Sequence, residues 1–106
     1  MELSDAGLIL KKLRDAEGFS LRRQAIKLDI GASYLCDISY GNRRMTVPVL
    51  QKIVKAYKYQ VKDDFYTLAS GCYDKNLIDR YKLRNHISDN TQAVKDLIFV
   101  MTGENL

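Results

Sequence analysis

Residues 20–39 read SLRRQAIKLDIGASYLCDIS, and the fold can be inferred from this segment first. Ser20 is a favoured N-cap residue, and apolar side chains recur after it on one helical face. Those apolar positions are Leu21, Ala25 and Leu28. This pattern predicts a short helix over residues 20–28, followed by a tight turn at residues 29–31.

A second short helix is expected directly after that turn, over residues 32–39. Leu35 and Ile38 stand three positions apart and form its buried side, and Gly41 with Asn42 then ends the helix. Two short helices separated by three residues match the spacing of a helix-turn-helix, in which the second helix lies in the major groove of DNA.

Five further helices are expected from caps and apolar stripes. Ser4 precedes one that ends near Gly18, and Thr46 precedes another that carries Pro48 in its first turn. The expected spans are 5–17, 47–57, 61–69, 74–87 and 92–102. An alternating strand is the alternative for the apolar run at 97–101. The chain is therefore expected to be all-α.

Length and composition restrict the possible functions. A chain of 106 residues, 46% hydrophobic and 28% charged, can build one modest core but not two full domains. Its net charge of +4 is unevenly distributed: residues 1–62 carry twelve basic and six acidic side chains, and residues 63–106 carry five and seven. The basic part is the candidate surface for a polyanion, although Lys and Arg that merely solvate helix faces are the alternative.

Several other classes of protein lack support. Cys36 and Cys72 form no Cys-x-x-Cys pair, and with His86 as the single histidine they cannot build a zinc site, so both are expected to be reduced thiols. Cys36 is expected to be buried and structural, with redox sensing as the alternative. Because the sequence has no glycine-rich phosphate loop and no metal cluster, we expect neither enzymatic activity nor a cofactor. No apolar run approaches about 18 residues, so no membrane segment is expected and the cytoplasm is the expected location.

Several short stretches in order carry a more specific resemblance. They are Lys-Lys-Leu-Arg at 11–14, Gly-Phe-Ser at 18–20, Ala25, Ile30, Ser-Tyr-Leu at 33–35, Ile38, Gly-Asn-Arg-Arg at 41–44 and residues 50–56. With these, residues 8–59 resemble the Cro/CI, or XRE, family of helix-turn-helix proteins, found in phage repressors and many small bacterial regulators. The resemblance implies a five-helix, phage-repressor-like DNA-binding domain over residues 1–69. Residues 72–106 are then a C-terminal helical extension for dimerisation or partner binding.

The resemblance also implies roles for individual residues on double-stranded DNA. Base contacts are expected from the exposed side of the second motif helix, at Ala32, Ser33, Tyr34 and Asp37. Phosphate contacts are expected from Ser20, Leu21, Arg22, Arg23, Asn42, Arg43 and Arg44. Asp37 could accept a hydrogen bond from cytosine, and its alternative role is that of a solvated or intramolecularly paired acid.

The sequence departs from the family pattern in and around the motif. Gln24 stands where the family usually has an apolar residue, and Gly31 replaces the usual Ser or Thr cap. In much of the family an acid near the end of the second motif helix pairs with the arginine of the first helix of the domain. Here Arg14 is present but Ser39 occupies the position of that acid, so Arg14 needs another partner or reaches a phosphate.

The last apolar segment is the expected interface of the extension. Its candidate residues are Val94, Leu97, Ile98, Phe99 and Met101. A homodimer is expected through them, because one recognition helix buries too little surface for tight specific binding. Packing of this segment back onto the DNA-binding domain is the alternative.

Two functions follow from these observations. The first is a sequence-specific transcriptional regulator, a repressor, that binds operator DNA as a dimer. The alternative is a protein-interaction module on the same fold, such as an antitoxin, an anti-repressor or an inhibitor, whose C-terminal segments bind a partner protein.

Overall fold

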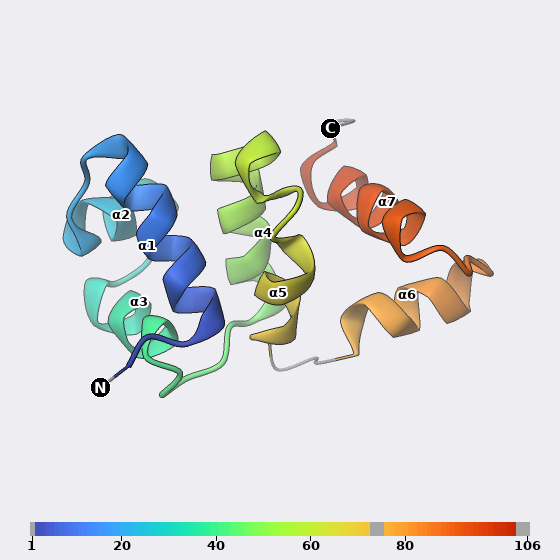
Figure 1. Cartoon of the computed structure of the whole chain (residues 1–106), viewed down its shortest axis with the longest axis horizontal. Helices are drawn as coiled ribbons and strands as arrows, with labels where there is room; N and C mark the ends of the chain where they lie inside the picture. The colour runs from blue at the N-terminus through green and yellow to red at the C-terminus, as the bar shows by residue number, and fades with distance from the viewer. Residues whose placement is uncertain (1, 73–75, 104–106) are drawn as a thin grey trace.

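The computed structural model describes residues 2–72 and 76–103. Within these ranges the backbone forms seven α-helices and one 3-10 helix, and no strand (Figure 1). The helices are α1 (Asp5–Glu17), α2 (Leu21–Leu28), α3 (Ala32–Ser39), α4 (Val47–Tyr57), the 3-10 helix η1 (Lys58–Val61), α5 (Phe65–Ser70), α6 (Leu77–Asn85) and α7 (Asn90–Thr102). The expectation of an all-α chain is confirmed for the described residues.

The expected helix caps are present at Ser4, Ser20 and Thr46. Their side-chain oxygens accept hydrogen bonds from the backbone N–H groups of Gly7 at 3.0 Å, Arg23 at 3.1 Å and Val49 at 3.3 Å. Each cap satisfies one of the donors that a helix leaves free in its first turn. Gly18 closes α1 in the left-handed conformation, with φ of 70°. These contacts explain why α1, α2 and α4 begin where the sequence predicts.

The expected helix over residues 61–69 is wrong at its start. After α4 the chain turns at Lys58, which has φ of 34°, and continues as η1 before α5 begins at Phe65. Asp64 precedes α5 without a side-chain cap, because its carboxylate pairs instead with Lys12 of α1 at 2.6 Å. Val61 and Phe65 are both fully buried, so a stripe with a spacing of four spans two different elements here.

The last two helices also differ from their expected spans. α6 covers Leu77–Asn85, whereas the predicted helix spanned residues 74–87. Residues 74 and 75 of that prediction lie outside the described ranges. It ends early because His86 adopts the left-handed conformation, with φ of 55°. α7 begins at Asn90 instead of residue 92, because Asp89 caps it by accepting from the N–H of Thr91 at 3.0 Å. The strand alternative for 97–101 is wrong, since these residues are helical.

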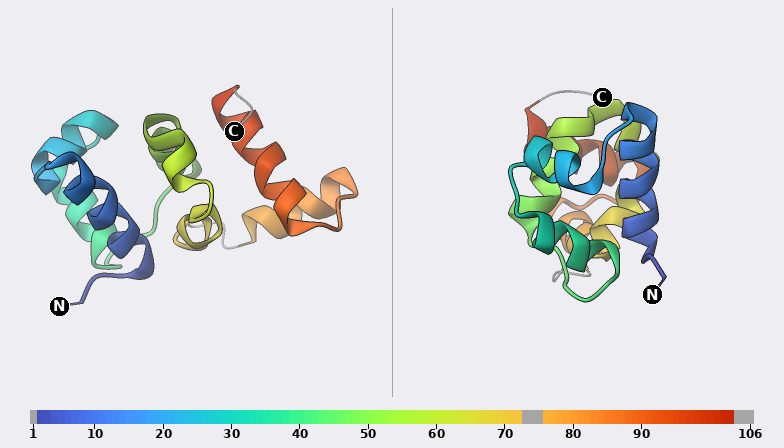
Figure 2. Two further views of the ribbon diagram at one scale, coloured as in Figure 1. Left: turned by 45° about the horizontal axis from the view of Figure 1, so that its top comes forward. Right: turned by 90° about the vertical axis from the view of Figure 1, so that its left-hand side faces the viewer.

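The helices are arranged along one long axis, with overall extents of 40 × 25 × 19 Å. In Figure 1 α4 stands in the middle, with α1, α2 and α3 on one side and α6 and α7 on the other. Figure 2 shows the same order after a turn of 45°. The motif helices α2 and α3 therefore lie at the end of the molecule away from α6 and α7.

One continuous apolar core joins the two ends of the molecule. It includes Leu10 of α1, Leu35 of α3, Ile53 of α4, Phe65 of α5 and Ile98 of α7, all nearly or completely buried. Burial of this kind contributes about 1.5–3 kcal/mol for each large apolar side chain. None of the described helices has the length and apolar character needed to cross a membrane.

The final helix is attached to the middle of the molecule. α7 buries Leu97, Ile98 and Met101, and the Gln51 side chain of α4 donates from Nε2 to the Met101 carbonyl oxygen at 2.9 Å. By contrast, α6 buries only Ile78 among its nine residues. The extension is thus held largely through α7.

Candidate nucleic-acid interface

The turn between α2 and α3 has the expected form. Asp29 adopts the left-handed conformation, with φ of 55°, which Asp tolerates better than most side chains. The N–H of Ile30 donates to the Ala25 carbonyl at 3.0 Å and closes the end of α2. Ala25 itself is buried, as a small residue at the contact of the two helices should be. The two helices are therefore joined by three residues in a fixed turn.

The outer side of α3 is only partly open at its start, because Ala32 and Tyr34 pack in part against the core. Leu35, Ile38 and Ser39 are buried on the inner side. Ser33 is exposed, and the other three expected base-contact residues, Ala32, Tyr34 and Asp37, are half-buried. Gly31 provides no side-chain cap. The predicted base-contact residues therefore do reach the surface of one helix.

Asp37 is paired with an arginine of its own chain. Its Oδ2 lies 3.3 Å from Nε of Arg43, and its carbonyl oxygen accepts from the N–H of Asn42 at 2.8 Å. The Arg43 guanidinium also lies 6.0 Å from the centre of the Tyr34 ring. Arg43 is thus held against the outer side of α3. The ion pair also agrees with the alternative expectation for Asp37, that of an acid paired within its own chain.

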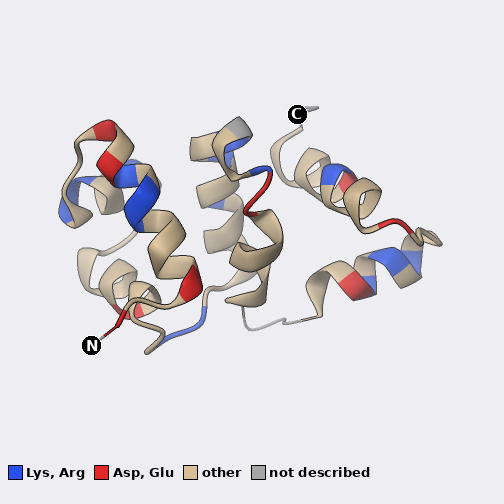
Figure 3. Ribbon diagram, viewed as in Figure 1, with Lys and Arg blue, Asp and Glu red and all other residues tan. Residues whose placement is uncertain are grey.

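A second group of basic residues lies at the start of α2. Ser20, Arg22 and Arg23 are exposed and Leu21 is half-buried. The guanidinium of Arg23 stacks over Phe19, 4.9 Å from the ring centre. Figure 3 shows basic residues on α2 and on the segment between α3 and α4. The cations expected to contact phosphate therefore flank the motif on both sides.

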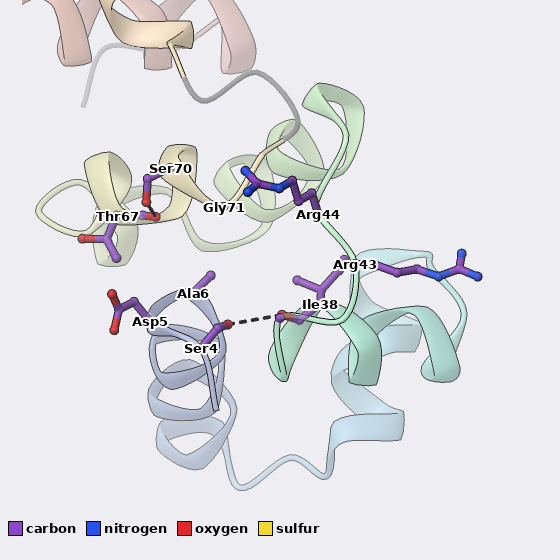
Figure 4. Close-up of a pocket in the computed structure, with 10 residues that line it drawn as sticks. Ser4, Asp5, Ala6, Ile38, Arg43, Arg44, Thr67, Ser70 and Gly71 are labelled. Carbon is purple, nitrogen blue, oxygen red and sulfur yellow. Dashed lines mark hydrogen bonds between the residues drawn. The ribbon is translucent and has the colours of Figure 1, made fainter. Parts of the chain in front are cut away.

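Arg43 and Arg44 extend in different directions. Figure 4 shows Arg43 projecting from the segment after α3, while Arg44 extends toward α5 and Gly71. Arg44 lines a pocket between α1, α3 and α5. The structure therefore does not bring Arg44 together with the side chains of α3 that were expected to contact bases.

A buried amide links the helices behind the motif. Gln24 of α2 donates from Nε2 to the Leu10 carbonyl of α1 at 2.9 Å and to Tyr57 Oη of α4 at 3.1 Å. Its Oε1 accepts from Nη1 of Arg14 at 3.4 Å. Arg14 therefore finds in Gln24 the partner that Ser39 cannot provide. The sequence signal for this contact was the polar residue at a position where the family has an apolar one.

Ion pairs and burial around this amide shift two pKa values. Burial raises the pKa of Tyr57 to about 12. The hydrogen bond from Lys27 lowers the pKa of Glu17, whose carboxylate lies 2.5 Å from Nζ of Lys27. Lys27 also lies 4.3 Å from the centre of the Tyr57 ring. Lys27 is thus occupied with partners of its own chain.

A close contact of α1 and α3 was missed in the sequence. The Ser39 carbonyl accepts from the N–H of Ser4 at 2.8 Å and from its Oγ at 3.1 Å. A Cβ on Gly7 would lie 2.0 Å from this carbonyl oxygen. Only glycine at position 7 permits this approach. The contact joins residues 32 positions apart, so no local pattern could reveal it.

The expected interface residues of α7 do not share one environment. Leu97, Ile98 and Met101 are buried within the chain and Val94 is half-buried, while Phe99 is 46% exposed. Val100, which was not among the expected residues, is 65% exposed. Three of the five residues expected at the interface are therefore buried within the chain. This agrees with the alternative expectation, in which the segment packs back onto the rest of the chain.

The cysteines and the metal-binding side chains offer no further site among the described residues. Cys36 and Cys72 are both free thiols, and Cys72 is buried. Cys36 is only half-buried, so the expectation of a buried thiol is wrong for this residue. No group of three His, Cys, Asp or Glu side chains in the described ranges could hold a metal ion.

Comparison of the chain with family models, curated proteins and solved structures finds no match.

Proposed function

We propose that the chain is a sequence-specific DNA-binding transcriptional regulator, a repressor of the Cro/CI type, that binds operator DNA as a dimer. The observation that supports this most directly is the pairing of α2 and α3 across the turn at residues 29–31, with Ser33, Tyr34 and Asp37 on the outer side of α3. A helix presented in this way fits the major groove of B-form DNA.

In this proposal α3 reads bases and α2 holds the backbone. Ser33 donates or accepts a hydrogen bond at a base edge, and Ala32 offers apolar contact to a thymine methyl group. The start of α2, with Arg22 and Arg23 exposed, binds phosphate. Arg43 stands beside α3, where it can contact the edge of the groove. Because few of these side chains discriminate bases strongly, sequence-dependent DNA shape contributes to specificity.

A dimer supplies the surface that one motif lacks. Two copies related by a two-fold axis read half-sites roughly 34 Å apart. Phe99 and Val100 lie side by side in the sequence of α7 and are both exposed, so they are the available apolar contacts for a second copy. The buried residues Leu97, Ile98 and Met101 serve the α4 contact in each copy.

The interaction module is the second candidate function. Leu83 of α6 is 81% exposed, and Phe99 and Val100 of α7 are exposed as well. A partner protein that covers these residues would make the chain an antitoxin, anti-repressor or inhibitor. Loss of DNA binding in the experiment below, together with a monomeric state, would favour this candidate.

The test is selection of bound sequences from a pool of random duplexes at two salt concentrations. The proposal expects an enriched palindrome, with half-sites about one helical turn apart. Weak binding that is sensitive to salt but not to sequence would contradict it.

Matched charge variants separate the motif from general electrostatics. Arg22→Gln with Arg23→Gln is expected to lower the slope of log affinity against log salt by about 0.9 for each lost phosphate contact. The control, Arg84→Gln with Lys95→Gln, removes the same charge from α6 and α7. An equal loss in both double variants would refute the assignment of the interface to α2 and α3.

A further inference from the structure

The segment after α3 folds back over the last turn of that helix. Gly41, with φ of 75°, reverses the chain, and its N–H donates to the Ile38 carbonyl at 3.1 Å. The next two N–H groups, those of Asn42 and Arg43, both donate to the Asp37 carbonyl, at 2.8 and 3.3 Å. Two hydrogen bonds to one acceptor fix the backbone here. The side chain of Arg43 therefore starts from a defined position beside α3.

Two side chains of α3 hold the guanidinium of Arg43. They are Asp37, whose Oδ2 lies 3.3 Å from Nε, and Tyr34, whose ring centre lies 6.0 Å from the guanidinium carbon. Figure 4 shows Arg43 pointing away from Arg44. The side chains of Arg43 and Asp37 are 61% and 40% exposed, so the pair is accessible to a ligand as large as DNA.

The ion pair leaves one edge of the guanidinium available. Asp37 approaches Nε, the nitrogen nearest the backbone, whereas the outer end of the group carries Nη1 and Nη2. These two nitrogens have parallel N–H donors, which match two acceptors that lie side by side. In the major groove guanine alone presents two acceptors on one base, its N7 and its O6. The available edge of Arg43 is thus complementary to guanine.

We propose that Arg43 contacts a guanine in the major groove of the operator, and that Asp37 positions it. This inference rests on the proposed function, and it replaces the expected contact of Arg43 with phosphate. The Asp37 carboxylate offsets the charge that would attract a phosphate group, whereas the guanine edge is uncharged. Arg43 also supplies discrimination that Ser33 lacks, because a hydroxyl pairs with several bases.

The test uses the duplex that the wild-type chain selects. Each guanine of one half-site is replaced in turn by adenine or by 7-deazaguanine, which lacks the N7 acceptor. At one position adenine should lower the affinity by about tenfold, the size of one bidentate base contact, and 7-deazaguanine by a smaller factor. Arg43→Met keeps the length of the side chain but removes its donors. In this variant the same replacements should change the affinity little.

Arg44→Met is the matched control for charge. It removes the same charge from the adjacent residue, whose side chain extends toward α5 (Figure 4), and it should keep the wild-type preference for guanine. A uniform loss of affinity in Arg43→Met, with the guanine preference intact and the salt slope lower by about 0.9, would assign Arg43 to phosphate. That result, or an equal loss of preference in both variants, would overturn the proposal.

Asp37→Asn tests the positioning role. Without the carboxylate the guanidinium is released from α3 and turns to phosphate. The guanine preference should therefore fall, although Arg43 keeps its donors and overall affinity rises at low salt. An unchanged preference would refute the positioning role. If Asp37→Asn loses the preference while Arg43→Met keeps it, Asp37 itself contacts the base and the proposal is wrong.

The outcomes distinguish this inference from the proposed function. If the wild-type chain enriches no sequence, both fail. If it enriches a palindrome in which no guanine contact depends on Arg43, the proposed function stands and this inference alone fails.

Discussion

The side chains of Gln24 and Tyr57 meet in the interior, where the amide nitrogen of Gln24 lies 3.1 Å from the phenolic oxygen of Tyr57. Both residues are almost completely buried, at 0% and 1% exposure. The same amide nitrogen contacts the Leu10 carbonyl, so one polar side chain joins α1, α2 and α4. A buried polar group without a hydrogen-bond partner destabilises the folded state. Removal of either Gln24 or Tyr57 therefore leaves a polar group of the other residue unpaired.

Replacement of this amide by a side chain of similar size should destabilise the fold. Gln24→Leu leaves the Tyr57 hydroxyl without its amide partner, and we expect the free energy of unfolding to fall by about 1–3 kcal/mol. Urea unfolding measures this change, and Gln60→Leu at an exposed position is the control. In the double variant with Tyr57→Phe, part of the loss should be recovered. Strict additivity of the two single effects would show that the hydrogen bond contributes nothing.

Tyr57 should make the fold sensitive to alkaline pH. Its pKa is about 12 in the folded chain against an ordinary value of 10.0, so above pH 10 the unfolded chain releases this proton while the folded chain keeps it. The contribution is fully present below pH 10 and is lost as the pH rises toward 12, by at most about 3 kcal/mol. Denaturant unfolding of the wild type and Tyr57→Phe over pH 9–11.5 measures it. Parallel declines in the two proteins would contradict this expectation.

Gly7 should tolerate no side chain. A Cβ there would lie 2.0 Å from the Ser39 carbonyl oxygen, which also accepts from Ser4. Gly7→Ala should therefore push α1 away from α3 and lower the free energy of unfolding by about 1–3 kcal/mol or more. Gly31→Ala, where a Cβ meets no atom within 4 Å, is the control for thermal unfolding. Equal thermal midpoints for the two variants would refute the close contact.

Asp37 should act on DNA through Arg43. Asp37→Asn removes the negative partner that lies 3.3 Å from Nε of Arg43, so the guanidinium becomes available to phosphate. We expect tighter binding to all duplexes at low salt and a slope of log affinity against log salt that is steeper by about 1. Fluorescence anisotropy at several salt concentrations measures both. A change in sequence preference with no change in slope would instead identify Asp37 as a base-reading residue.

The sequence was informative where local signals decide the structure. Ser4, Ser20 and Thr46 mark helix starts because their side chains bond within three residues. The span of α5 was not predictable, since the buried residues Val61 and Phe65 show helical spacing although Val61 ends η1 and Phe65 begins α5. In the candidate interface, the apolar residues Leu35 and Ile38 correctly predicted which side of α3 is buried, and therefore which side is exposed.

Contacts between distant residues account for what was missed in the candidate site. The partner of Arg14 is Gln24, and the carbonyl of Ser39 meets the start of α1. The different directions of Arg43 and Arg44 also depend on tertiary surroundings, because adjacent residues in an irregular segment have no fixed periodicity. Such features follow from packing and not from the order of residue types.

The thin attachment of α6 has a consequence for local unfolding. With Ile78 as its one buried side chain, α6 can open while most of the core stays closed. Its amide hydrogens should therefore exchange with solvent deuterium sooner than those of α4, where Leu50, Ile53 and Val54 are fully buried. α7 retains its own contacts with α4 through such openings. We therefore expect the helices that pack around α4 to unfold together in one cooperative transition, while α6 opens and closes separately.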